Sequence, residues 1–280
     1  MVNQLSAIQM LSVADADINI TRIKKLLTEL DPYKNQLILL PENAISFTDR
    51  AGYFNVSEEL GKGYYQQQLA DLSKQYECYL ICGSFPIKSK QPDKIFTTML
   101  VFSPQGKLIS HYHKIHLFDA LVGDEKGSYR ESDTFIPGQD YVLFDWQCDD
   151  YRSVKVGLAI CYDLRFPGLF QRLRAEGAEV LLLPAAFTHK TGEAHWQPLL
   201  QARAIENQCY VVAVNQGGKH ESGRETFGHS MIISPWGEIL SQLKYGEGNV
   251  QAKYDQTRID QIRQAMPIAL HNRFYSDLAP

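Results

Sequence analysis

The sequence lacks the features that distinguish membrane, secreted and nucleic-acid-binding proteins. None of its apolar runs approaches the roughly 20 residues that a membrane-spanning helix requires. The first residues, MVNQLSAIQMLSVADADINI, contain no basic segment followed by an apolar one, so we expect no signal peptide. Lys and Arg (28) are fewer than Asp and Glu (32), and this balance argues against nucleic acid or an anionic membrane as the main partner.

Cysteine is also scarce, and low-complexity segments and short-period repeats are absent from the sequence. The five cysteines are an odd number without metal-type pairing, so we expect neither a disulfide framework nor a metal finger. This cysteine usage favours a reducing compartment, and we expect a cytoplasmic protein. A chain of 280 residues, 44% of them hydrophobic and 21% charged, suits one large globular domain or two small ones.

What the sequence does contain is a series of apolar runs bounded by turn residues, which predict β-strands. They are LSAIQM, QLILLPE, CYLICGSF, FTTMLVFS, SVKVGLAI, EVLLLPAA, CYVVAVN and HSMIISPW. Apolar residues at helical spacing predict helices between them, the first capped by Asp17 or Asn19, over 20–30, 64–76, 169–176, 194–207 and 259–265. A hairpin is expected to turn at 103–106. Helix, two strands and helix in succession indicate a layered α/β sandwich.

The run VGLAICYDLRFP changes from apolar to charged at Cys161, which therefore stands where a strand ends and a helix is about to begin. A nucleophile on such a turn is exposed, and the backbone N–H groups around it can stabilise an anion. A free thiol has a pKa of about 8.5, so it needs a base, a cation or a local dipole to react near neutral pH. Taken alone, a cysteine after an apolar run is more often a small core residue.

Two other strand ends supply a base and a cation. Glu42 follows the apolar run of LILLPENA, and Lys114 lies late in the strand of LISHYHKIHLFD. A second carboxylate, Glu131, lies in the region 119–139, which is rich in Gly, Ser, Asp and Glu and is expected to form a long functional loop. A carboxylate can take the proton of a thiol, and an ammonium can stabilise a thiolate and an oxyanion. Each of these residues alone would ordinarily be solvated, but together they indicate an active site.

A histidine partner for the thiol is the main alternative. His111 and His113 share one face of the strand that leads to Lys114, and His116 lies on the other face. Histidines can also hold zinc, but no cysteine or carboxylate is spaced with these three as a metal finger requires. We interpret them as packing or site-wall residues. The other cysteines lack a strand-end setting and are expected to be structural, namely Cys78, Cys82, Cys148 and Cys209.

The motifs LLPEN, HKIHLFD and GLAICYDLRFP, in this order, resemble those of the carbon–nitrogen hydrolases of the nitrilase superfamily, and the resemblance runs over nearly the whole chain. It implies a single domain over 1–280 that folds as a four-layer αββα sandwich. It also implies a homodimer or a larger homo-oligomer, to whose contacts the segment 255–280 would contribute. No metal or organic cofactor is implied.

The same resemblance implies a Glu–Lys–Cys triad, carried over here to Glu42, Lys114 and Cys161. Glu131 corresponds to a second glutamate that the family places near the triad. The implied reaction is acyl transfer from an amide to the thiol, followed by hydrolysis of the thioester. Lys114 and the backbone N–H of Tyr162 would stabilise the tetrahedral oxyanion.

Three further stretches, TGEAHW, ARAIENQCYV and RETFGHSMIISPWG, resemble the branch that contains the deaminated glutathione amidases, whose sister enzymes are the omega-amidases. The former release 2-oxoglutarate and cysteinylglycine from deaminated glutathione, whereas the latter release ammonia from 2-oxoglutaramate or 2-oxosuccinamate. The tail LHNRFYSDL and Gln197 depart from that branch, which bears on substrate range and assembly. A true nitrilase and a catalytically silent protein that binds a metabolite or a partner are the alternatives.

Both kinds of amide substrate carry a carboxylate beside a keto group, and a planar guanidinium binds a carboxylate in bidentate fashion. Arg165 is the leading candidate, and Arg203 is a second one whose ordinary role would be an ion pair with Glu206. Thr188 and Thr191 follow the strand LLLPAAF and are expected to line the pocket. The loop GGKHESGRETFGHS is expected at the edge of the site, where it could accommodate a longer, peptide-like substrate.

Overall fold

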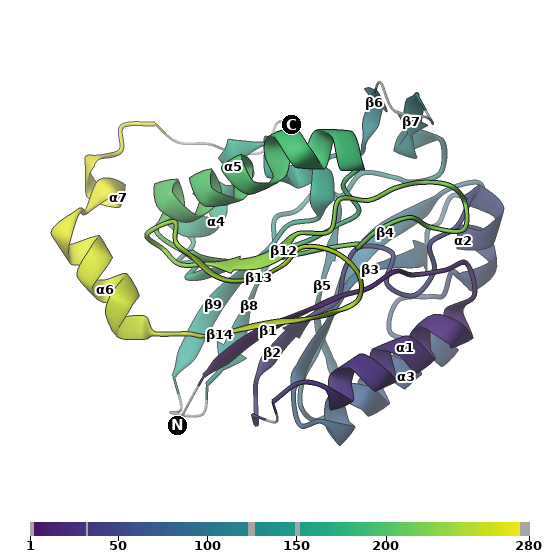
Figure 1. The fold of residues 1–280 in the computed structure, drawn as a ribbon, viewed down its shortest axis with the longest axis horizontal. Coiled ribbons are helices and arrows are strands. Elements are labelled where there is room, and N and C mark those ends of the chain that lie inside the picture. The colour runs from purple at the N-terminus through teal and green to yellow at the C-terminus, as the bar shows by residue number, and fades with distance from the viewer. Residues whose placement is uncertain (1–2, 32, 123–126, 149–151, 275–280) are drawn as a thin grey trace.

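The structure, a computed structural model, describes residues 3–31, 33–122, 127–148 and 152–274 (Figure 1). Within these ranges the strands form two large sheets, with the orders β14-β1-β2-β3-β4-β5 and β13-β12-β11-β10-β9-β8. The first sheet consists of β1 Gln4–Gln9, β2 Leu37–Leu39, β3 Tyr79–Lys88, β4 Ile95–Phe102, β5 Leu108–His113 and β14 Gly248–Lys253. The second consists of β8 Leu143–Gln147, β9 Ser153–Leu158, β10 Val180–Ala185, β11 Tyr210–Asn215, β12 Ser230–Ile233 and β13 Ile239–Leu243.

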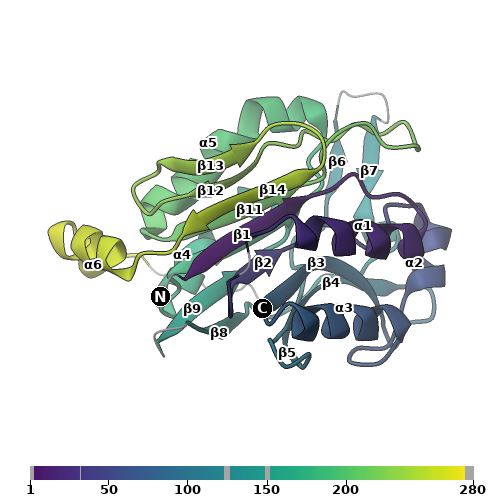
Figure 2. The ribbon, with the colours of Figure 1, turned by 60° about the horizontal axis from the view of Figure 1, so that its bottom comes forward.

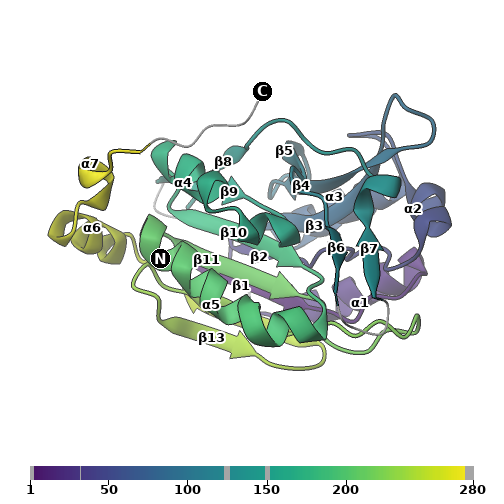
Figure 3. The same cartoon turned by 90° about the horizontal axis from the view of Figure 1, so that it is seen from above.

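Helices cover the outer faces of both sheets. The helices α1 (Ala16–Thr28) and α3 (Tyr64–Gln75) lie on the first sheet (Figure 2). The helices α4 (Pro167–Ala175) and α5 (His189–Asn207) lie on the second sheet (Figure 3). Between the sheets, apolar side chains from both inner faces form one continuous buried cluster. The chain is therefore a four-layer αββα sandwich, and the expected fold is confirmed.

The burial of the central strands on both faces explains why their sequences are apolar at consecutive positions. In the second sheet, β10 pairs in parallel with both β9 and β11, and every residue of β10 and β11 is buried. Strands that are covered on one side by the other sheet and on the other side by helices have no polar face. Because parallel neighbours end at the same edge, the segments that follow β9, β10 and β11 emerge together.

The capping prediction for the first helix was wrong by two residues or more. Asp15 is the N-cap of α1, and its Oδ1 accepts hydrogen bonds from the N–H groups of Asp17 and Ile18. Asn19 lies inside the helix and is fully buried, where its amide bonds the carbonyl of Ile45. The helix α5, expected from residue 194, begins at His189, only a few residues after the end of β10 at Ala185.

The hairpin at 103–106 is present between β4 and β5, and the N–H of Gly106 donates to the carbonyl of Ser103 at 2.8 Å. The region 119–139, which we expected to be one long loop, instead contains regular structure. Its segments β6 (Asp119–Leu121) and β7 (Ser128–Arg130) pair in antiparallel fashion and lead into the short 3-10 helix η1 (Glu131–Asp133). These strands were not predicted because they are short and lie outside the sandwich, so their sequences are polar and show no apolar pattern.

The remaining helices lie at the two ends of the molecule. The helix α2 (Arg50–Val56) is near β6 and β7, whereas α6 (Gln256–Ala265) and α7 (Ile268–His271) extend away from the sandwich (Figure 1). Leu270 is 77% exposed there. The contribution of the segment 255–280 to oligomer contacts stays a prediction, and its residues 275–280 lie outside the described ranges. Among the described residues, none of the helices has the length and apolar character needed to cross a membrane.

A close backbone approach at Gly83 fixes the distance between β3 and the end of β2. Gly83 lies at a bulge in β3, and a Cβ at this position would be 2.1 Å from the carbonyl oxygen of Leu40 and 2.5 Å from that of Pro41. A Cβ would also be 2.5 Å from the side chain of Pro184 in the second sheet. These neighbours are backbone and a rigid ring, so they cannot move aside easily.

We therefore predict that Gly83→Ala destabilises the fold by about 1–3 kcal/mol, the usual range for overpacking. A matched control is Gly157→Ala, whose Cβ would come no closer than 3.0 Å, to the flexible side chain of Leu173. Urea unfolding measures both variants, and the loss at position 83 should be clearly the larger. Equal losses would show that the contact between β3 and the end of β2 is not constrained by sterics.

Candidate active site

The three strand ends that carry the predicted catalytic residues meet at one edge of the sandwich. Glu42 lies shortly after β2, and Lys114 directly follows β5 in the same sheet. Cys161 is the first residue of the 3-10 helix η2 (Cys161–Arg165), which follows β9 in the other sheet. The site is therefore assembled from both sheets, and Glu131 joins it from η1.

Lys114 lies at the centre of this arrangement and is fully buried. Its Nζ is 2.9 Å from Oε1 of Glu42 and 2.9 Å from Oε2 of Glu131. Burial alone would lower the pKa of Lys114, but the charges of Glu131 and Glu42 hold it well above its ordinary value. The side chain is thus an ammonium, and two carboxylates provide the charge that a buried cation requires.

The second glutamate is held firmly on its own side of the ammonium. The Oε2 of Glu131 also accepts a hydrogen bond of 2.7 Å from the backbone N–H of Phe118. Glu42 is only 3% exposed, and its backbone carbonyl accepts a hydrogen bond of 2.9 Å from the side chain of Gln216. Next to it, the N–H of Asn43 donates to Oγ of Ser84, which lies in the bulge of β3.

Cys161 stands on a strained turn. Its φ of +49° lies in the left-handed region, which a residue other than glycine adopts at a cost of about 1–3 kcal/mol. Burial raises the pKa of its thiol well above the ordinary value, the charge of Glu42 raises it further, and the ammonium of Lys114 lowers it in part. A pKa shifted in this direction favours the protonated thiol near neutral pH, so the thiol would need a base in order to react.

Asp163 ties the turn of Cys161 to the segment that carries Lys114, a role that sequence analysis missed. It is fully buried, and its carboxylate accepts hydrogen bonds of 2.8 Å from the hydroxyl of Tyr112 and 2.8 Å from the N–H of Ile160. Its Oδ1 also bonds the backbone N–H and the Nδ1 of His116, at 3.1 Å and 2.7 Å. One carboxylate thus links two sheets beside the site.

A cavity of about 230 Å³ opens beside these residues. Among the predicted site residues, those that line it are Glu42, Glu131, Cys161, Tyr162, Arg165, Thr188 and Thr191. Lys114 is not part of the lining and lies behind the two glutamates. The guanidinium of Arg165 lies 5.4 Å from the centre of the Phe187 ring, and its Nη1 is 3.3 Å from Nδ1 of His195.

Arg203 lies apart from the cavity, and the expectation that it binds substrate requires correction. Its side chain is buried, and its Nε and Nη2 donate to the carbonyl of Leu164 at 3.1 Å and 2.7 Å. Its Nη1 pairs with Glu206 at 2.7 Å. The guanidinium is thus engaged by the protein and supports the turn η2 from behind.

The histidines near Lys114 do not line the cavity, which disfavours a Cys–His pair. The ring of His113 stacks on Phe96, with ring centres 4.2 Å apart, and burial lowers its pKa to about 4. His116 stacks on Phe166 and pairs with Asp163, so it has a packing role. Within the described ranges, no group of three or more His, Cys, Asp or Glu side chains could hold a metal ion.

Tyr53 and Arg224 are among the residues of the cavity wall that the sequence analysis did not single out. Tyr53, on α2, is half-buried, and desolvation of its hydroxyl raises its pKa above the ordinary value. Arg224 belongs to the loop GGKHESGRETFGHS, which was expected at the site edge, and its Nη2 donates to the carbonyl of Ala186 at 2.7 Å. The quoted loop was a usable signal for Arg224, whereas nothing in the sequence around Tyr53 indicated a place in the cavity.

A thiol and a carboxylate that line one cavity, with an ammonium in contact with the carboxylate, suit acyl transfer. The carboxylate of Glu42 can take a proton from sulfur, and the ammonium can stabilise the negative charge that develops on a carbonyl oxygen. The carboxylate of Glu42 and the ammonium of Lys114 are already in contact at 2.9 Å, although they come from separate segments of the chain.

Comparison with known proteins agrees with this geometry. Residues 4–264 match the family described as carbon–nitrogen hydrolase. The chain is 41% identical over 277 residues to the deaminated glutathione amidase of Yersinia enterocolitica, covering 99% of this chain and 95% of that protein. It is 34% identical over 275 residues to the human omega-amidase NIT2, covering 98% and 96%.

A solved structure gives the same result for the fold. The crystal structure of Saccharomyces cerevisiae Nit3, a member of branch 10 of the nitrilase superfamily, superposes with a TM-score of 0.83 and 29% sequence identity, and each chain is covered to 97%. The family match spans the sandwich and every residue of the site. The chain belongs to the carbon–nitrogen hydrolase family of the nitrilase superfamily.

Proposed function

We propose that the protein is an amidase that hydrolyses the amide bond of deaminated glutathione through a thioester on Cys161. The observation that carries this proposal is the position of Lys114 Nζ, 2.9 Å from both Glu42 and Glu131, beside the cavity that Cys161 lines. The names of the Yersinia and human relatives support amide hydrolysis, and the former supports this substrate in particular.

In the proposed reaction, Sγ of Cys161 attacks the amide carbon while Glu42 takes the thiol proton. The oxyanion of the tetrahedral intermediate is stabilised by the ammonium of Lys114 and the N–H of Tyr162. Glu42 then gives its proton to the leaving nitrogen, the C–N bond breaks, and a thioester remains. Glu42 takes a proton from water, which attacks the thioester, and returns it to the sulfur as the carboxylic acid leaves. Glu131 holds Lys114 in position throughout.

Substrate recognition in this proposal rests on Arg165, with Thr188 and Thr191 beside it. Arg165 is held between two aromatic rings, at 5.9 Å from the centre of Tyr162 and 5.4 Å from that of Phe187. A guanidinium fixed in this way can bind the carboxylate of a 2-oxo acid in bidentate fashion. The hydroxyls of Thr188 and Thr191 lie 2.9 Å apart in the same cavity and can donate to the keto or carboxylate oxygens.

A second candidate is an omega-amidase that acts on 2-oxoglutaramate or 2-oxosuccinamate. The human relative carries that name, and the acyl part of 2-oxoglutaramate equals that of deaminated glutathione, so Arg165 would serve both. A nitrilase and a silent binding protein are less favoured because the base, the ammonium and the thiol are all present. Comparison of kcat/KM for deaminated glutathione, 2-oxoglutaramate and simple aliphatic amides separates these functions, and preference for the last would contradict the role of Arg165.

We also propose that the protein is a cytoplasmic homo-oligomer. All five cysteines are buried and none of them forms a disulfide within the described ranges, which suits a reducing compartment. Large apolar side chains are exposed on the second sheet and on the segment 255–280, including Trp236 at 57% and Phe274 at 84%. Such residues commonly mark contacts between subunits. Sedimentation velocity should therefore give a mass of at least a dimer, and a monomer at micromolar concentration would contradict this proposal.

Replacement of the nucleophile tests the function directly. Cys161→Ala should lower kcat with deaminated glutathione by at least about 1,000-fold, because the thioester can no longer form. Cys148→Ala is the matched control, since Cys148 is buried between the sheets away from the cavity and should leave turnover within about threefold. Release of 2-oxoglutarate measures both, and thermal unfolding checks that each variant folds. Undiminished turnover in Cys161→Ala would remove this residue as the nucleophile.

The charge of Glu42 gives a prediction in which two readouts move in opposite directions. Glu42 raises the pKa of Cys161, so Glu42→Gln should lower that pKa and increase the thiolate fraction at pH 7.5. Alkylation by iodoacetamide should therefore become several-fold faster, while amide turnover should fall by about 100-fold or more because the base is lost. Slower alkylation in Glu42→Gln would show that Glu42 ionises the resting thiol instead.

A further inference from the structure

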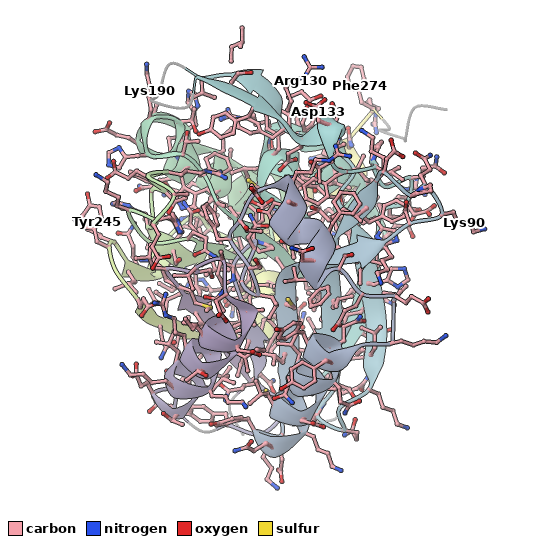
Figure 4. All side chains as sticks on the ribbon, turned by 90° about the vertical axis from the view of Figure 1, so that its right-hand side faces the viewer. Lys90, Arg130, Asp133, Lys190, Tyr245 and Phe274 are labelled. Atoms are coloured by element: carbon pink, nitrogen blue, oxygen red, sulfur yellow. The ribbon has the colours of Figure 1, made fainter. Side chains whose placement is uncertain are left out.

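A second and larger cavity of about 970 Å³ adjoins the one that contains Cys161. Four residues line both cavities, namely Thr48, Asp49, Tyr129 and Arg224. The second cavity, which we call the outer cavity, is otherwise lined mainly by residues 12–14 and 189–190 and by the loop 219–225. Lys190 of the outer cavity and Arg130 of the inner one lie at the same end of the molecule (Figure 4).

Arg224 is the cation at the passage between the two cavities. Its guanidinium lies 5.0 Å from the centre of the Phe47 ring and 5.3 Å from that of Tyr129, and its Nη2 is held by the carbonyl of Ala186. Its Nε is buried and has no hydrogen-bond partner within the described ranges. None of the ion pairs found among the described residues includes Arg224. A rigidly held cation that the protein leaves unpaired is suited to an anionic ligand.

Arg224 lies on the side of Cys161 where the amine portion of a bound amide substrate would extend. Ala186, whose carbonyl binds Arg224, also donates its backbone N–H to the sulfur of Cys161. Arg165, by contrast, lines the inner cavity alone. A substrate whose acyl carboxylate binds Arg165 has its amide carbon at Cys161, and the group on its amide nitrogen then extends towards Arg224. An amide that loses only ammonia places nothing in the outer cavity.

We propose that the outer cavity binds the amine portion of an N-substituted amide, and that Arg224 binds a carboxylate on that portion. This proposal rests on the proposed amidase function and assigns a subsite to the leaving peptide. Lys190 and Lys219 add positive charge to the lining, while Asp49, Glu221 and Glu225 add negative charge, so the lining as a whole is balanced. Selection for an anionic leaving group therefore depends on Arg224, and the site favours peptide-like over ammonia-releasing substrates.

The test pairs a change in the substrate with a change in the protein. The substrates are deaminated glutathione and its derivative in which the terminal carboxylate is a carboxamide. In the wild-type protein, the carboxamide should lower kcat/KM by about 10- to 100-fold, the usual effect of losing a charge-assisted hydrogen bond. In Arg224→Gln, both substrates should have similar kcat/KM values, within about threefold. An equal loss in the two proteins, or no loss in the wild type, would overturn the assignment.

A third substrate separates this proposal from the proposed function. Turnover of 2-oxoglutaramate, which has no leaving peptide, reports on the inner cavity and the nucleophile. If the wild-type protein hydrolyses 2-oxoglutaramate but deaminated glutathione is not a better substrate, the outer subsite is refuted while the amidase function stands. If neither is hydrolysed, the amidase function itself fails. Lys107→Gln serves as the control variant, because Lys107 is exposed and lines neither cavity, so its loss should leave the carboxamide effect close to that of the wild type.

Discussion

A fully buried ammonium is stable only beside negative charge, and the active site depends on how Lys114 meets that need. Glu42 comes from the end of β2 and Glu131 from η1, so two separate segments must converge on one nitrogen. Loss of either carboxylate would leave an uncompensated buried charge, which typically costs about 3–5 kcal/mol. The same requirement that holds the chemistry together therefore also holds the fold together at this edge.

Behind this group of charges, further hydrogen bonds from buried side chains hold the surrounding backbone in place. Asp163 fastens the turn of Cys161 to the segment of Lys114, and Arg203 holds the carbonyl of Leu164 in the same turn. On the other flank, Arg224 holds the carbonyl of Ala186. Backbone groups on both sides of Cys161 are thus fixed by side chains, which explains how its φ of +49° is maintained.

Sequence patterns predicted the layers of the fold and the residues at strand ends, because both depend on local features. Apolar runs predicted the strands, and the change from apolar to polar at Glu42, Lys114 and Cys161 marked the places where the chain leaves the sheets. The structure brings these residues together, and their catalytic roles remain a proposal. Capping was less predictable, since Asp15 rather than Asp17 meets the free N–H groups of α1.

Residues whose position depends on contacts distant in the sequence could not be predicted in the same way. Asp163 reads as one more charge in CYDLRFP, and only the approach of Tyr112 and His116 from the other sheet gives it a role. Arg203 looked suitable for a substrate carboxylate, but its helix turns it towards η2. The pairing of β6 with β7 was hidden because three-residue strands carry too few side chains to show an alternating pattern.

The protonated state of the resting thiol has a consequence for the survival of the protein under oxidising conditions. Hydrogen peroxide oxidises thiolates to sulfenic acid, whereas protonated thiols react only slowly. Burial and the adjacent negative charge of Glu42 favour the protonated thiol of Cys161 over the thiolate. The proposed nucleophile, deprotonated only during attack, would thereby be shielded from the peroxide that inactivates enzymes with a permanent thiolate.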